Sequence, residues 1–210
     1  MPRPSLADDL PLRSRTSPAW ALVALAQPVA LLDDHAHLEK KAAVNALGLL
    51  QGCPHGATAE EATRWTRTLA GIARDEAEHL HLVLRVLAHR GGALSRTHRN
   101  PYAAALHGEV RSGDHELLDR LLVGGLIEAR SCERFEALVA AGPDDELRAL
   151  YGGLCASERG HHRAFLELAR IVAPEAEVEA RWDELLDRER AAIESQAAGP
   201  RMHSGAPTRE

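Results

Sequence analysis

Residues 69–87 read LAGIARDEAEHLHLVLRVL, and they carry the clearest structural signal in the chain. Apolar side chains recur there at the spacing of one face of an α-helix, namely Leu69, Ile72, Val83 and Leu87. Glu76 and His79 fall on the same face and interrupt it with two polar groups. Burying a carboxylate and an imidazole without partners costs several kcal/mol, so a compensating partner is expected at this point.

The same pattern recurs in residues 147–168, which read LRALYGGLCASERGHHRAFLEL. The apolar face of this helix is formed by Leu147, Tyr151, Leu154, Phe165 and Leu168. Glu158 and His161 interrupt that face near its middle. Either Glu-x-x-His pair alone fits a buried polar network as well as it fits a metal site. A third match, Glu78 and His81, points away from the apolar face of the first helix. These residues lie two positions after Glu76 and His79, and residues two apart lie on opposite sides of a helix.

Two further helical faces each contribute one inward carboxylate. The first face consists of Leu32, His35, Glu39, Ala42, Ala46 and Leu49, and the second of Leu121, Gly124 or Gly125, Glu128, Cys132, Phe135 and Val139. Glu133 is the rival of Glu128, but it lies five positions further along the helix, which places it about 140° away from the apolar face. The two inward carboxylates are therefore Glu39 and Glu128.

The four faces together predict a metal centre. One Glu from each of two helices, with Glu-x-x-His from each of two others, is the arrangement of di-iron and di-manganese carboxylate proteins. Four carboxylates balance two divalent cations, and oxygen-rich ligation with one imidazole per metal suits iron or manganese. The predicted metal ligands are Glu39, Glu76, His79, Glu128, Glu158 and His161. Open coordination positions would admit dioxygen.

Helix start and stop signals divide the chain into an all-α architecture. Four long helices are expected at residues 31–50, from Thr58 to Gly91, from Asp114 to Gly142, and from Asp144 or Asp145 to just before Pro174. The connection 92–113, with a short helix after Asn100, crosses between two short-looped hairpins. These features predict a ferritin-like four-helix bundle with a long crossover and extra peripheral helices.

The peripheral segments are a short apolar stretch at residues 20–26 and a strongly charged helix at about residues 175–195. We expect a single domain at residues 1–198 with its core at about 31–170, followed by a disordered tail at 199–210.

Composition limits the classes of function. The chain has 210 residues, of which 45% are hydrophobic and only 3% aromatic, and this favours helices over a β-sandwich or barrel. Its three cysteines form no CxxC pair, and no run of 18 apolar residues occurs. A cytoplasmic protein without a membrane span is therefore expected. The formal net charge of -6 offers no general attraction for nucleic acid, so such a role must depend on a local patch.

At these residues the chain resembles the tRNA 2-methylthio-isopentenyladenosine hydroxylases, a family of the ferritin-like superfamily. The matching segments are residues 34–36, 39–43, 76–79, 126–135 (LIEARSCERF) and 157–161, within a region spanning 31–170. The resemblance implies hydroxylation of the isopentenyl group of the modified adenosine next to the anticodon. It also implies two iron ions held by the six residues above, dioxygen as co-substrate and an electron donor that the sequence does not identify. The substrate would be the tRNA anticodon stem-loop, and the enzyme a monomer or small homo-oligomer.

Several residues around this site are candidates for supporting roles. His35 lies one turn before Glu39 and is a candidate for a partner that orients this ligand or for an extra ligand, although a core histidine bonded to a neighbour is the favoured interpretation. Cys132 lies one turn after Glu128 and is a candidate for a residue that supports this ligand or that is redox-active, although a cysteine that fills space is the favoured interpretation. Candidates for tRNA phosphate contacts are Lys40, Lys41, Arg85, Arg90, Arg96 and Arg99. A solvated basic surface explains these six equally well.

Three other functions use a similar bundle. A ferritin-like cage that oxidises and stores iron would use the same six ligands. A di-iron hydroxylase of a quinone or lipid would need an exposed amphipathic face, and the charged helix at residues 175–195 fits that poorly. A manganese catalase would turn over peroxide without an electron donor.

Overall fold

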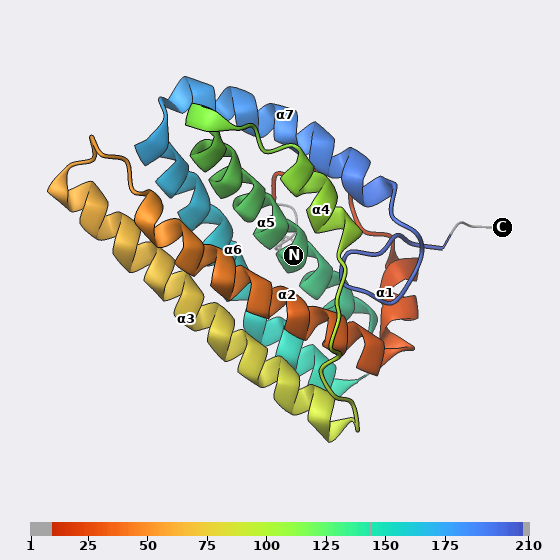
Figure 1. The fold of residues 1–210 in the computed structure, drawn as a ribbon. Coiled ribbons are helices and arrows are strands. Elements are labelled where there is room, and N and C mark those ends of the chain that lie inside the picture. The colour runs from red at the N-terminus through yellow and green to blue at the C-terminus, as the bar shows by residue number, and fades with distance from the viewer. Residues whose placement is uncertain (1–9, 143, 208–210) are drawn as a thin grey trace, which may run out of the picture.

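Four long helices form the centre of this computed structural model, which describes residues 10–142 and 144–207. They are α2 (Pro28–Leu49), α3 (Ala59–His89), α5 (Glu116–Ala141) and α6 (Asp145–Val172). Figure 1 shows two hairpins, α2 with α3 and α5 with α6, packed side by side. The predicted all-α four-helix bundle is therefore confirmed.

Local capping explains where these helices begin. The Thr58 side chain accepts a hydrogen bond from the Glu61 backbone, and the Glu61 carboxylate accepts one in return from the Thr58 backbone, at 2.8 Å. Asp144 caps α6 by accepting from the backbone N–H of Leu147 at 3.0 Å. Both starts agree with the sequence prediction. In contrast, α5 begins at Glu116, after the short 3-10 turn η3 (Gly113–His115), rather than directly at Asp114.

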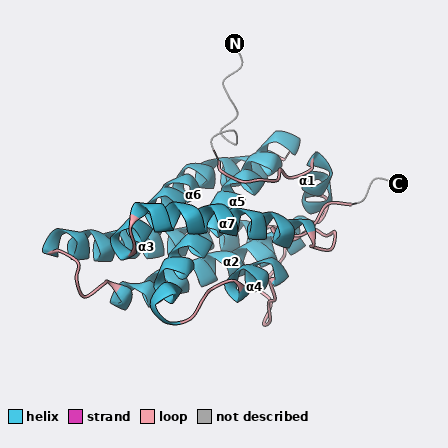
Figure 2. Ribbon diagram, turned by 90° about the horizontal axis from the view of Figure 1, so that it is seen from above, coloured by secondary structure: helices cyan, strands magenta, loops and turns pink. Residues whose placement is uncertain are grey.

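The crossover and the peripheral helices cover the bundle. A short helix, α4 (Pro101–Gly108), lies within the long connection between α3 and α5, as expected. Helix α7 (Glu175–Glu194) packs on the outside against α4, α5 and α6, and α1 (Pro18–Leu25) packs against α2 and α5. Viewed from above, the described chain consists of helices joined by loops (Figure 2). Within the same residues, no helix is long and apolar enough to cross a membrane.

The apolar core is split into two clusters along the bundle axis. One cluster contains Trp65, Leu69 and Phe165, and the other contains Phe135 and Tyr151. The residues of the predicted metal centre lie between the two clusters along each of the four helices. The polar layer is therefore enclosed by hydrophobic packing at both ends, which keeps bulk water away from it.

The segment after Gly199, predicted to be a disordered tail, is instead packed against the bundle as far as Ala206. Met202 is fully buried, and its backbone N–H donates to Asp34 Oδ2 at 2.9 Å. Arg134 donates to the backbone carbonyl of Ser204 at 2.9 Å. A buried methionine and satisfied backbone groups stabilise this segment, so that part of the prediction is wrong. Residues 208–210 of the predicted tail lie outside the described residues.

Candidate metal centre

Six side chains converge at mid-bundle from the four long helices. Their ligand atoms form two groups, each with all atoms within 4.8 Å of one another: Glu39, Glu76, His79 and Glu158 in the first, and Glu76, Glu128, Glu158 and His161 in the second. All six residues are buried. These are the six residues that helical periodicity selected. The structure adds that Glu76 and Glu158 belong to both groups.

In the two Glu-x-x-His pairs, each histidine contacts the glutamate of the other pair. His79 Nδ1 of α3 lies 3.1 Å from Glu158 Oε1 of α6. His161 Nδ1 of α6 lies 2.6 Å from Glu76 Oε1 of α3. The two imidazole rings are 5.9 Å apart between centroids. Each histidine therefore faces the carboxylate of the opposite helix, and the site forms a single connected unit.

The electrostatics are those of a cluster crowded with negative charge. Burial raises the pKa of Glu39 and Glu128 well above the usual range, and burial together with the charge of Glu76 raises the pKa of Glu158 to about 8. Burial also opposes ionisation of Glu76, but the neighbouring imidazoles outweigh it and hold that pKa below its usual value. For His79, burial lowers the pKa, yet the surrounding carboxylates raise it to about 12.

Four buried atoms at the centre have no hydrogen-bond partner in the described residues. This observation indicates whether cations fit the site, because ligation would satisfy such atoms. They are Glu76 Oε1, His79 Nδ1, Glu158 Oε1 and His161 Nδ1. Unsatisfied polar atoms in a buried site carry a desolvation cost that ligation would remove. The donors are four carboxylates and two imidazoles, a set that suits two divalent ions of the iron or manganese type. The residues present therefore fit such a centre.

His35 contacts Glu39, a member of the first group. Its Nε2 contacts Glu39 Oε1, and burial lowers the pKa of His35 to about 3, so the ring is neutral. The ring stacks on Tyr151 with centroids 5.5 Å apart. His35 thus lies outside both ligand groups and orients Glu39 by a hydrogen bond, in line with the interpretation of a core histidine bonded to a neighbour.

Tyr151 is a neighbour of the site that sequence reasoning treated only as core. Its hydroxyl is buried and has no hydrogen-bond partner among the described groups. Burial and the charge of Glu39 raise its pKa, so the phenol stays protonated. The sequence did contain an indication of this, because Tyr151 lies on the inward face of α6 and a buried tyrosine hydroxyl usually has a hydrogen-bond partner.

Two other residues of α5 have partners outside the centre. Glu133, the rival of Glu128, accepts from the Thr16 backbone at 2.7 Å and from Arg130 at 3.0 Å. Cys132 is fully buried and contacts Cys155 of α6, with 3.1 Å between the sulfur atoms. Neither residue belongs to the two groups of carboxylates and imidazoles.

A cavity of about 470 Å³ opens beside the second group, and Glu128 forms part of its wall. Its apolar walls are Leu38, Ala42, Ala103, Ala104 and Ile127. Helix α4 and the loop before it supply one side, so the crossover frames the access to the site. Lys41 and Arg99 line the same cavity, and Lys41 Nζ lies 2.8 Å from His98 Nδ1.

The six candidate tRNA contacts separate in the structure. Lys41 and Arg99 are exposed residues of the cavity lining, and Lys40 and Arg96 are exposed nearby in sequence. Arg85 lines a different hollow, between α3 and α6.

Arg90, the remaining candidate, is only 20% exposed. It forms ion pairs with Asp144 at 2.8 Å and with Glu146 at 2.9 Å. Its charge is therefore already neutralised within the chain.

The chain is similar to known proteins along nearly its whole length. The family described as tRNA-(MS[2]IO[6]A)-hydroxylase (MiaE) matches residues 7–204. A Pseudomonas putida protein named tRNA 2-(methylsulfanyl)-N(6)-isopentenyladenosine(37) hydroxylase is 39% identical over 194 residues, covering 91% of each chain. A Salmonella typhimurium protein of the same name is 34% identical over 139 residues, which is 65% of this chain and 50% of that protein.

A solved structure also resembles this fold closely. It is a protein from Synechococcus titled "Protein 43 with aldehyde deformylating oxygenase activity". The TM-score is 0.83 at 36% sequence identity, and the match covers 93% of this chain and 96% of the other. The similarity in structure therefore includes the bundle, the crossover and the peripheral helices.

Proposed function

Because the chain belongs to the family of tRNA 2-(methylsulfanyl)-N(6)-isopentenyladenosine hydroxylases, we propose that it hydroxylates the isopentenyl group of that adenosine, using a di-iron centre. The observation that carries the proposal is the cavity, because its apolar walls lead to Glu128 while Lys41 and Arg99 line the same opening. An apolar pocket with a few polar groups is what a branched hydrocarbon attached to a nucleoside requires.

The six clustered residues would hold the two irons. One ion would take Glu39 and His79, the other would take Glu128 and His161. Glu76 and Glu158, which belong to both groups, would help to hold both ions. When bound, the ions would supply the activation of dioxygen, with two electrons from an external donor, so that one oxygen atom enters a C–H bond and the other leaves as water.

The remaining residues of the site would bind and orient the substrate. The side chains of Leu38, Ala42 and Ile127 would surround the isopentenyl group and exclude water from the carbon to be hydroxylated. Lys41 and Arg99 would contact tRNA phosphates near the modified base, which adds affinity without reading sequence. His35 would hold Glu39 in place through its neutral ring. We expect the enzyme to work in the cytoplasm as a monomer or small homo-oligomer.

The cavity also bears on the alternatives. An iron-storage protein or a catalase handles only ions, dioxygen or peroxide, and needs no apolar chamber of about 470 Å³ beside a ligand. The chamber therefore favours an organic substrate.

The test is nucleoside analysis of tRNA treated with the purified, iron-loaded protein. The tRNA is taken from cells that lack the gene, so that it carries the unhydroxylated nucleoside, and a chemical reductant and labelled dioxygen are supplied. We expect the nucleoside to gain one labelled oxygen atom. The variant Glu128→Ala should abolish this incorporation, whereas Glu78→Ala, on the outer face of α3, should retain it. An iron-loaded protein that leaves the nucleoside unchanged would contradict the substrate but not the metal centre.

A further inference from the structure

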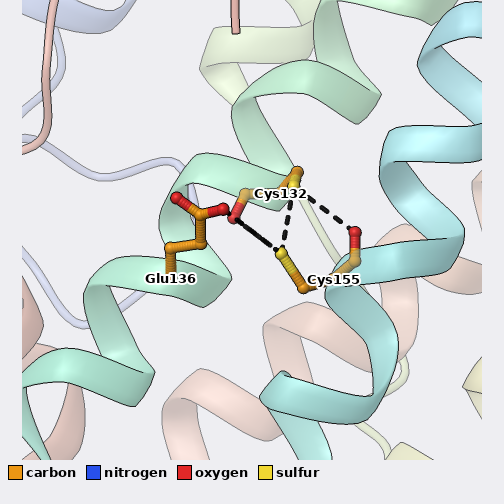
Figure 3. Close-up of side chains that lie close together, drawn as sticks. All are labelled: Cys132, Glu136 and Cys155. Carbon is orange, nitrogen blue, oxygen red and sulfur yellow. Dashed lines mark hydrogen bonds between the residues drawn. The ribbon is translucent and has the colours of Figure 1, made fainter. Parts of the chain in front are cut away.

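Two cysteines from neighbouring helices meet in the core outside the metal centre. Cys132 of α5 and Cys155 of α6 are free thiols whose sulfur atoms lie 3.1 Å apart (Figure 3). Cys132 is fully buried and Cys155 is 6% exposed. The third cysteine, Cys53, is half-buried beyond the end of α2. The chain thus has one close pair of thiols and one separate thiol.

The pair is arranged face to face across the helix interface. Cys132 Sγ lies 3.4 Å from the backbone carbonyl oxygen of Cys155, and Cys155 Sγ lies 3.8 Å from that of Cys132. A disulfide bond is about 2.05 Å long, so the sulfur atoms need to approach by only about 1 Å. Rotation of the two side chains, with little movement of α5 or α6, would bring them into bonding distance.

The contact between the two thiols, together with a nearby carboxylate, makes the two thiols unequal. Cys155 Sγ lies 3.6 Å from Glu136 Oε1, and Arg159 donates to the same oxygen at 3.0 Å. The hydrogen bond from Cys155 lowers the pKa of Cys132 despite its burial, while the same contact, burial and Glu136 raise the pKa of Cys155. An attacking thiolate beside a protonated partner is the pairing that thiol–disulfide chemistry uses.

Cys132, Glu136 and Cys155 also offer three donor atoms within 4.8 Å, as a thiolate metal site would. Two observations favour a dithiol instead. The guanidinium of Arg159 already binds the Glu136 carboxylate, and its positive charge opposes a cation at the same oxygen. A closed zinc site would moreover need four ligands, whereas this group of the described residues contains only three His, Cys, Asp or Glu side chains.

We propose that Cys132 and Cys155 are a reversible dithiol–disulfide pair, oxidised by a hydroperoxide and reduced again by an external dithiol. The Cys132 thiolate attacks the peroxide to give a sulfenic acid and hydroxide, which takes up a proton to form water. The Cys155 thiol then attacks the sulfenic acid and expels a second water as the disulfide forms. Two thiols and one hydrogen peroxide thus become one disulfide and two waters, and thiol–disulfide exchange with the external dithiol restores both thiols.

The bond would link the two helices next to the metal centre. Cys132 follows Glu128 by one helical turn, and Cys155 precedes Glu158 by one turn. Oxidation would therefore fix the separation of α5 and α6 beside two of the clustered carboxylates. A cross-link that closes the α5–α6 hairpin restricts the unfolded chain, and should raise the thermal midpoint by about 10 °C.

The test is a redox titration of the full-length chain. Reduced protein is equilibrated with mixtures of oxidised and reduced dithiothreitol, the remaining thiols are alkylated, and peptides are identified by mass spectrometry. We expect a linked Cys132–Cys155 peptide, lighter by two hydrogen atoms, to form and disappear around one midpoint, with Cys53 alkylated throughout. A parallel peroxide titration should consume about one peroxide per disulfide. Cys53→Ser should retain the link, whereas Cys132→Ala and Cys155→Ala should lack it.

Three results would overturn the proposal. The first is complete alkylation of Cys132 and Cys155 both in the most oxidising mixture and after the peroxide titration. The second is formation of a sulfinic acid at either position without the cross-link. The third is binding of one zinc ion that is lost in Cys132→Ala but kept in Glu128→Ala, which would make the cluster a metal site. The central measurement uses the unaltered chain, so its outcome does not depend on whether a variant folds.

Discussion

His79 of α3 and Glu158 of α6 face each other across the bundle, with His79 Nδ1 at 3.1 Å from Glu158 Oε1. Neither atom has a hydrogen-bond partner of proper geometry in the described part of the chain, although both are buried. The same holds for His161 Nδ1 and Glu76 Oε1, at 2.6 Å. This crossed pairing means that each Glu-x-x-His helix completes the ligand group of the other.

Membership of the two ligand groups predicts different losses of metal. Glu158 belongs to both groups, so Glu158→Ala should bind almost no iron. Glu39 belongs to one group only, so Glu39→Ala should keep about one ion per chain. Metal analysis after anaerobic loading measures this, and circular dichroism checks that the helices remain. His81→Ala, on the outer face of α3, is the control and should bind as much iron as the original chain. Equal iron content in Glu158→Ala and the original chain would refute the assignment.

The cavity predicts a steric effect on turnover. Ala104→Trp should fill the chamber beside Glu128 and lower kcat/KM about tenfold or more, because the isopentenyl group can no longer enter. Iron content should not change. Ala105→Trp is the matched control, since this neighbour on α4 lines a different hollow. Similar losses of kcat/KM in both variants would show that the chamber is not the substrate site.

Salt dependence should separate the basic residues that contact tRNA from those that do not. Lys41→Ala and Arg99→Ala should each reduce the slope of log affinity against log salt concentration by about 0.7 to 0.9, because one phosphate contact is lost. Arg90→Ala should leave the slope unchanged, since Arg90 is paired with Asp144 and Glu146. Filter binding at several salt concentrations gives these slopes. A larger change in Arg90→Ala than in Lys41→Ala would contradict the proposed contact surface.

A buried ion pair outside the site should be important for stability. Arg130 donates to Glu189 at 2.8 and 2.9 Å, and Tyr102 donates to the same carboxylate at 3.0 Å. Arg130→Met should lower the free energy of unfolding by about 3–5 kcal/mol, because Glu189 is left buried without an opposite charge. Removing both charges in Arg130→Met with Glu189→Leu should recover much of that loss.

Urea denaturation measures both changes. Arg188→Ala, at an exposed position on the same helix as Glu189, should stay within about 0.5 kcal/mol of the original chain. A double variant no more stable than Arg130→Met would show that the pair is not a coupled unit.

His203 should make stability sensitive to acid. Burial, with the charges of Arg134 and Arg130, lowers its pKa well below the ordinary 6.5. Below pH 6.5 the His203 imidazole therefore binds a proton in the unfolded chain but not in the folded chain. The free energy of unfolding falls as pH decreases. Between pH 7 and pH 5.5, His203→Gln should remove about 1.2 kcal/mol of this fall.

The measurement compares urea denaturation at pH 7 and pH 5.5. The exposed residue His81 provides the control, and His81→Gln should follow the original chain. If His203→Gln loses stability as steeply as the original chain, then His203 is not the group responsible.

Helical periodicity was sufficient to identify the fold class and the six clustered residues. The pattern that places Glu76 and His79 on one face of α3 is local, because it depends only on residues within two turns. The same reasoning preferred Glu128 to Glu133, and the structure places Glu128 in a ligand group and Glu133 against Thr16. Capping at Thr58 was equally local. A repeat of 3.6 residues encodes which side of a helix faces inward.

Contacts between distant segments could not be inferred in this way. Nothing in the sequence pattern pairs Asp34 with Met202, joins Cys132 to Cys155, or shows that Arg90 is neutralised from α6. These contacts depend on how the helices are rotated and shifted against one another, and on where the chain returns after α7. Such positions result from the packing of the whole bundle, for which no single helix carries a periodic signal. For the same reason, only the assembled bundle could show that Glu76 and Glu158 belong to both ligand groups.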